Sequence, residues 1–96
     1  MSNYRERYNE ALESGDLRRQ IESLEGLAGE AIRRGETLAA PRLVEEAFET
    51  LMRSGNDISR ISRARIGSRL IRVWLKSAAR ARRDGIDPSK YWFFRT

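Results

Sequence analysis

The sequence predicts an all-α protein, a small helical bundle of about four helices arranged as two αα-hairpins. In four segments the apolar residues recur every three or four positions, which is helical spacing, and no segment alternates with a period of two. Glycine-containing turns near residues 15, 35, 55 and 85 separate or end these segments. The 96 residues fit one domain, 1–96, in which residues 85–96 form an aromatic tail.

The first two segments form the first predicted hairpin. Residues 3–13 place Tyr4, Tyr8 and Leu12 at four-residue intervals. Residues 17–34 follow Asp16, which stands where an N-cap side chain would serve the next helix. Their apolar seam has nearly heptad spacing and consists of Leu17, Ile21, Leu24, Ala28 and Ala31.

The last two segments form the second predicted hairpin. Residues 41–53 begin at Pro41, whose missing N–H is no loss in a first helical turn. Their predicted buried face consists of Val44, Ala47, Phe48, Leu51 and Met52. Residues 58–83 form the longest segment, with Asp57 as its predicted N-cap and Gly67 as a point where it could bend. Its predicted inner side consists of Gly67, Leu70, Ile71, Trp74, Ala78 and Ala81, flanked by Ile66 and Leu75, and Trp74 is expected to be buried with Leu70 and Phe48.

The composition argues against several classes of function. The chain has no cysteine and no histidine, so thiolate sites, the usual general base and the commonest zinc ligand are all missing. An acidic cluster at Glu36, Glu45, Glu46 and Glu49 is interpreted as a solvated face. We expect a protein that is not an enzyme and that holds no cofactor and no metal. No long apolar run and no signal peptide are evident, so we expect a cytoplasmic protein without a membrane partner.

Positive charge is concentrated in the second half of the chain. Residues 1–50 contain 7 arginines and 11 acidic residues, whereas residues 51–96 contain 12 lysines and arginines and 3 acidic residues. Arginine greatly outnumbers lysine, which fits phosphate recognition because the guanidinium fork matches phosphate oxygens, although genome composition gives the same bias. The split predicts that the second half meets an acidic partner, unless the acidic helices neutralise it internally.

One face of the last helix carries a cationic stripe. Its members are spaced by three or four residues and are Arg65, Arg69, Arg72, Lys76, Arg80 and Arg83. At 1.5 Å per residue the stripe is about 27 Å long. No acidic residue occurs between Ile58 and Arg83, although solvated faces normally mix both signs.

The stripe predicts a surface for nucleic-acid phosphates, with DNA favoured and little sequence specificity. The alternative is a protein-interaction module that docks an acidic protein surface or a second copy of the chain. Such a module would be a regulator, inhibitor or assembly adaptor, of a kind that phage or plasmid genomes encode. A plain solvated face is the third interpretation.

The tail contains four consecutive aromatic residues, Tyr91, Trp92, Phe93 and Phe94. Adjacent side chains cannot all face one way, so two of them are expected to pack back onto the bundle. The alternative is an exposed hook for a partner.

Overall fold

The computed structural model describes residues 3–85, which are 84% helical and contain no strand. The elements in chain order are α1 (Tyr4–Ser14), α2 (Leu17–Arg33), α3 (Ala39–Arg53), the short 3-10 helix η1 (Gly55–Asp57) and α4 (Arg60–Arg83). The predicted all-α class and the four helices are therefore confirmed, and each boundary lies within two residues of its predicted place.

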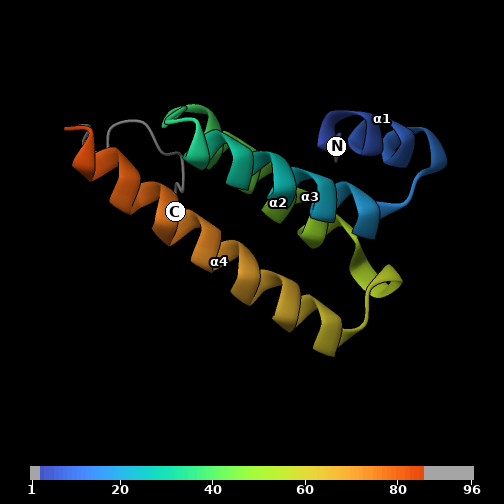
Figure 1. Cartoon of the computed structure of the whole chain (residues 1–96). Helices are drawn as coiled ribbons and strands as arrows, with labels where there is room; N and C mark the ends of the chain where they lie inside the picture. Colours follow the sequence, from blue (N-terminus) through green and yellow to red (C-terminus); the bar gives the residue numbers. More distant parts are fainter. Residues whose placement is uncertain (1–2, 86–96) are drawn as a thin grey trace.

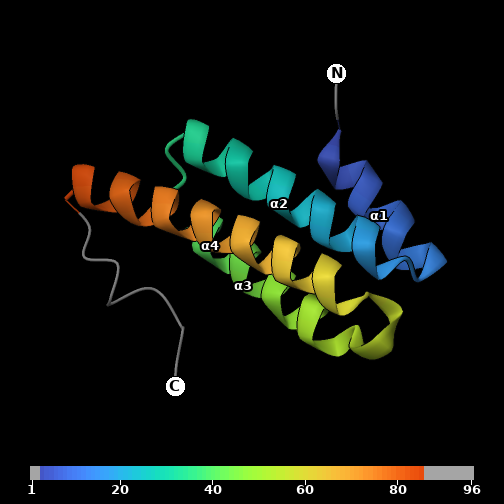
Figure 2. The ribbon, with the colours of Figure 1, turned by 90° about the horizontal axis from the view of Figure 1, so that it is seen from below.

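Helices α2, α3 and α4 lie side by side, and α1 packs on α2 (Figure 1). Contacts along α4 fix its direction: Arg69 meets Glu25 of α2, and Arg80 meets Gly35 in the turn after α2. Helix α4 therefore runs parallel to α2 and, because α2 and α3 form a hairpin, antiparallel to α3. Seen from below, α4 lies in front of α2 and α3 and runs between them, and no other helix of the described residues lies in front of it (Figure 2).

Side-chain caps start three of the helices. Asn3 accepts a hydrogen bond from the backbone N–H of Glu6, and Asp16 accepts one from that of Arg19, each at 3.1 Å. The predicted cap at Asp16 is thus confirmed, whereas the predicted cap at Asp57 is wrong. Ser59 caps α4 instead, because Asp57 lies in η1 and the buried Ile58 is extended.

The core is a layer of aliphatic side chains between α2, α3 and α4, to which α1 adds Tyr8. Its buried members are Tyr8, Ile21, Leu24, Ala28, Val44, Ala47, Leu51, Ile58, Ile66 and Leu70. Phe48 and Trp74 pack against this cluster and are partly buried. The prediction that they pack together with Leu70 is confirmed, but Trp74 is not fully buried. Trp74 also contacts a second small cluster, Ala78 and Ala81.

Two apolar residues of α1 and α3 face solvent, and one of them, Met52, was predicted to be buried. Leu12 is 50% exposed, and its neighbour Ala11 is buried against α2 instead. Met52 is 81% exposed, while Thr50 is buried and donates a hydrogen bond to the carbonyl of Glu46. In both helices the inward face is shifted by one or two residues, because the angle at which a helix meets its neighbours decides which edge of an apolar stripe is covered.

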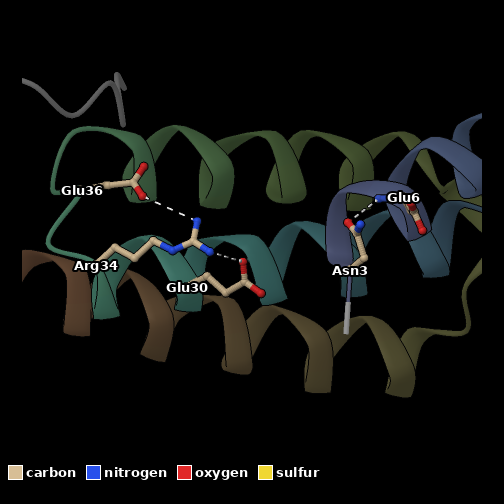
Figure 3. Close-up of polar contacts among 5 residues, drawn as sticks. All are labelled: Asn3, Glu6, Glu30, Arg34 and Glu36. Atoms are coloured by element: carbon tan, nitrogen blue, oxygen red, sulfur yellow. Dashed lines mark hydrogen bonds and ion pairs between the residues drawn. The ribbon is translucent and has the colours of Figure 1, made fainter. Parts of the chain in front are cut away.

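In the turn between α2 and α3, away from the cationic face of α4, an arginine is flanked by two carboxylates. Arg34 lies between Glu30 at 3.8 Å and Glu36 at 3.9 Å, and all three side chains are drawn in Figure 3. The same view shows the Asn3 cap of α1. The two carboxylates offset the positive charge of Arg34, so this turn adds little to the positive potential of the surface.

Candidate binding surface on helix α4

Helix α4 presents the cationic stripe on its uncovered side. It is continuous from Arg60 to Arg83, through Gly67, because no side chain or proline interrupts its hydrogen bonding. Five of the six stripe side chains are exposed, and Arg80 is half-buried. The expected orientation toward solvent is confirmed for Arg69, Arg72 and Lys76 and holds only in part for Arg80.

Arg69 is tied to the neighbouring helix. Its Nε lies 3.3 Å from Oε1 of Glu25 on α2, and both side chains are partly exposed. An ion pair in this setting contributes little stability, since solvent screens it. It does neutralise one cation of the stripe and fixes the position of its guanidinium.

Arg80 is engaged at both ends of its guanidinium. Its Nε lies 3.4 Å from Oδ2 of Asp84, the residue that directly follows α4. Its Nη2 lies against Gly35, where a Cβ would come within 3.1 Å. Arg80 therefore packs on the α2–α3 turn, and it is a poorer candidate for contacting a ligand than the rest of the stripe.

The other four stripe cations lack an ion-pair partner among residues 3–85. Within residues 3–85, no carboxylate lies at ion-pair distance from Arg65, Arg72, Lys76 or Arg83. All four are exposed. Internal neutralisation by the acidic helices, which the sequence left open, thus reaches the stripe only at Arg69.

A shallow depression lies beside the N-terminal half of the stripe. Its lining comes entirely from α4 and consists of Ala64, Arg65, Ser68, Arg69 and Arg72. Three guanidinium groups and one exposed hydroxyl surround it, and all of them are hydrogen-bond donors. The arrangement is suited to an oxyanion with several oxygen acceptors.

An exposed apolar ridge runs along α4 next to this depression. It consists of Ile61, Ile71 and Leu75, which are 70%, 52% and 55% exposed. At ~100° per residue the ridge lies roughly 100° around the helix from the stripe. The placement of Ile71 on the inner side was therefore wrong, because α2 and α3 cover only the sector around Leu70.

The exposed ridge was not predicted, although the sequence contains a signal for it. The apolar residues of α4 from Ile66 round to Ile61 cover more than half of the helix circumference. A helix packed on two neighbours needs an apolar sector only a little wider than about 100°. The excess could have shown that one apolar edge would remain uncovered.

The predicted partner hook, Tyr91, Trp92, Phe93 and Phe94, lies outside the described residues, as does Lys90.

In the described part of the chain, no helix is long and apolar enough to cross a membrane. Nor do residues 3–85 bring together three side chains that could hold a metal ion. Surface depressions elsewhere mix both charge signs, such as the one that contains Arg7, Glu10, Arg19 and Glu22 between α1 and α2.

Comparison of the chain with protein-family models, with curated protein sequences and with solved structures gives no match in any of the three.

Proposed function

We propose that this protein binds nucleic acid by holding backbone phosphates along the stripe of α4. The observation that carries the proposal is the donor-lined depression at Arg65, Ser68 and Arg72, with Arg69 held beside it by Glu25. A phosphate placed there accepts hydrogen bonds from guanidinium groups and from the Ser68 hydroxyl. Charge-assisted bonds of this kind are the strong ones.

The length of the stripe fits a polymer better than a single anion. Arg65 and Arg83 stand about 27 Å apart along the helix, a distance that spans roughly 8 base pairs of duplex at 3.4 Å each. The free cations are distributed over this whole length and are not gathered at one point. A bound duplex would therefore contact several of these cations at once, and the individually weak phosphate contacts would add up.

Such contacts give little sequence specificity. Phosphate contacts position a protein on the duplex, whereas base edges carry the sequence information. The uncharged residues beside the stripe are Ala64, Ser68 and the apolar ridge, and none carries the amide group that reads adenine with two hydrogen bonds. We therefore expect similar affinity for unrelated sequences, with duplex DNA as the favoured ligand.

The test compares the wild-type chain with two variants that lose equal charge. The stripe variant changes Arg65, Arg72, Lys76 and Arg83 to Gln, and the matched control changes the exposed Arg18, Arg19, Arg33 and Arg42 to Gln. Fluorescence anisotropy with two unrelated duplexes of about 20 base pairs, longer than the 8 that the stripe spans, measures Kd from low to moderate salt. Circular dichroism verifies that each variant is folded.

With four phosphate contacts, log K of the wild-type chain should fall with log salt with a slope of about −3.6. The stripe variant should lose most of the affinity and most of the slope, whereas the control variant should keep most of both. Equal losses in the two variants would show that only net charge matters. No binding of either duplex at low salt would overturn the proposal.

The apolar ridge favours a second candidate, the docking of an acidic protein. Apolar side chains beside cations suit a partner that offers apolar and carboxylate groups together. A synthetic acidic helix with leucines along one edge is the probe, and polyglutamate is its control. Tighter binding of the leucine-bearing helix than of the duplex, abolished by changing Ile61, Ile71 and Leu75 to Ser, would favour this candidate.

A further inference from the structure

We infer that the C-terminal half of the apolar ridge is the docking site of the chain's own tail, with two aromatic side chains of residues 91–94 seated on Ile71 and Leu75. These two residues are 52% and 55% exposed although they belong to the most apolar part of α4. The inference goes beyond the proposed function, since it concerns a different face of α4 and needs no nucleic acid.

Helix α4 ends shortly before the aromatic residues begin. Gly85 has a φ of 79°, the left-handed conformation that ends helices, and its N–H bonds to the carbonyl of Arg82. Three residues later Pro88 lacks an N–H and disfavours helical geometry at Asp87. The left-handed Gly85 therefore ends α4, and the sequence beyond it does not favour further helix.

The reach of the tail selects which part of the ridge it can cover. Leu75 and Ile71 lie about 15 Å and 21 Å back along the helix from Gly85, at 1.5 Å per residue. Residues 91–94 lie six to nine residues beyond Gly85, and an extended chain of that length spans at most about 20–32 Å. Ile61 lies about 36 Å back, beyond the reach of all four aromatic residues.

The spacing of the two surfaces also matches. Ile71 and Leu75 are one turn apart, which is about 6 Å along the helix. In an extended chain alternate side chains face the same way and are about 6.6 Å apart. Either Tyr91 with Phe93 or Trp92 with Phe94 can therefore contact both ridge residues while the other pair points away.

Charge argues against a second copy of the chain as the occupant. Helix α4 has no acidic residue before Asp84, so two copies paired along the ridge would bring one cationic stripe near another. The tail adds only one acidic residue and two basic ones, at Asp87, Lys90 and Arg95. Each aromatic side chain that packs on the ridge buries large apolar area without adding to this repulsion.

Thiol protection gives a direct test, because the chain has no cysteine of its own. Leu75→Cys and Ile61→Cys each place a single thiol on the ridge, within and beyond the reach of the tail. Each is made with the aromatic residues intact and with Tyr91, Trp92, Phe93 and Phe94 all changed to Ser. Removing the aromatic residues should raise the alkylation rate of the thiol at position 75 several-fold and leave that at position 61 unchanged.

Equal rates at position 75 with and without the aromatic residues would overturn the inference. Protection that grows with protein concentration would also overturn it, because a second copy would then be the occupant. A second measurement does not require a thiol at the docking site. In Trp74→Phe, Trp92 is the sole indole. A red shift of its emission when Ile71 and Leu75 become Ser, but not when Ile61 becomes Ser, would identify Trp92 and Phe94 as the pair on the ridge, and no shift would assign the contact to Tyr91 and Phe93.

Both measurements are made without any polyanion. A failure of the duplex to bind therefore leaves the tail inference standing, and a failure of the tail to protect Leu75 leaves the phosphate contacts of the stripe standing.

Discussion

At the scale of single residues, Tyr8 carries a hydrogen bond that joins α1 to α3. Its hydroxyl donates to Oε1 of Glu46 at 2.7 Å, and the ring is buried. Burial raises the pKa of Tyr8 to about 12, helped by the hydrogen bond to Glu46 and by the negative charge of that carboxylate. Glu46 belongs to the acidic cluster that was expected to be merely solvated, so one member of it has a structural role.

Tyr8→Phe should lower the free energy of unfolding by about 1.5–3 kcal/mol at neutral pH, the range for hydrogen bonds to charged groups. Because the pKa of Tyr8 is higher in the folded chain, about 12, than its ordinary value of 10, folding favours the protonated phenol. The contribution is complete below pH 10 and is lost as the pH rises through 12. Urea unfolding across this range should show the wild type and Tyr8→Phe converging.

The matched control is Tyr4→Phe, since the Tyr4 ring contacts Arg7 by a cation–π interaction that does not need the hydroxyl. This variant should keep nearly the wild-type stability at neutral pH. A gap between wild type and Tyr8→Phe that stays constant from pH 9 to pH 12 would contradict the assignment of the late-titrating phenol to Tyr8.

Two glycines on α2 should respond differently to the same substitution. A Cβ on Gly26 would lie 2.5 Å from the ring carbons Cδ1 and Cε1 of Tyr4, whereas at Gly29 the nearest atom is Nη1 of Arg33 at 3.5 Å. Gly29→Ala should stabilise the fold by roughly 1 kcal/mol through helix propensity. Gly26→Ala should stabilise the fold by less than Gly29→Ala, or should destabilise it, because the Tyr4 ring must move.

Thermal or urea unfolding of the two single variants measures this difference. In a Tyr4→Ala background the ring is gone, so Gly26→Ala should then stabilise as much as Gly29→Ala. Identical effects of the two glycine substitutions in the wild-type background would show that the Tyr4 ring does not rest on α2.

Trp74 links the main core to the small cluster of Ala78 and Ala81. Trp74→Ala should lower the free energy of unfolding by about 3 kcal/mol, the lower end of the range for large aromatic deletions, because the side chain is only partly buried. Ile61→Ala, at a residue that is 70% exposed, is the control and should change stability by less than about 0.5 kcal/mol. Equal melting temperatures for wild type and Trp74→Ala would contradict this packing.

At the scale of the element, α4 combines three faces on one helix: the side packed on α2 and α3, the cationic stripe and the apolar ridge. Like charges one turn apart repel each other, and salt screens that repulsion. The variant with Arg65, Arg72, Lys76 and Arg83 changed to Gln should therefore be as stable as the wild type or slightly more stable at low salt.

Salt should narrow this difference in stability between the two chains. The free energy of unfolding of the wild type should rise from low to moderate salt relative to that of the stripe variant, as the repulsion is screened. Urea unfolding at several salt concentrations measures this difference. A stripe variant that is less stable than the wild type at low salt would show that these cations are engaged in the fold and are not available to a ligand.

At the scale of the whole molecule, α1 is held less firmly than the other helices. It packs on α2 and contributes only Tyr8 and Ala11 to the buried interior, and it joins α2 through Gly15 in a left-handed conformation. Its last turn is secured by Gln20, whose buried side-chain amide donates to the carbonyl of Ala11 at 3.2 Å. A helix with so few buried contacts opens at lower free energy than the core.

Native-state hydrogen exchange should therefore show the amides of Leu12 and Glu13 exchanging by local opening, well before those of Leu24 and Leu70. Gln20→Ala should speed exchange in α1 more than in α4, because it removes the bond that secures the last turn of α1. Uniform protection across all four helices would show instead that the chain unfolds as a single cooperative unit.

The sequence by itself determined most of the local structure. The 3.6-residue period of the apolar residues, the Asp16 cap and the glycines after α1 and α2 placed the helices correctly, because these signals act within a few residues of the chain. The same period placed the stripe on one face of α4, since a helix converts spacing directly into direction. The Asp57 cap failed because Ile58 is drawn into the core, which is a tertiary effect.

Only the tertiary structure decided which edge of each apolar face is covered. A sequence gives the apolar sector of a helix, but the number and crossing angle of its neighbours set how much of that sector they bury. Met52 and Ile71 were misplaced for this reason. Glu25 and Glu46 lie far along the chain from Arg69 and Tyr8, so no local pattern could pair them. The fold made these contacts, and within the described part of the chain it left Arg65, Arg72, Lys76 and Arg83 without an ion pair, because α2 and α3 meet only one side of α4.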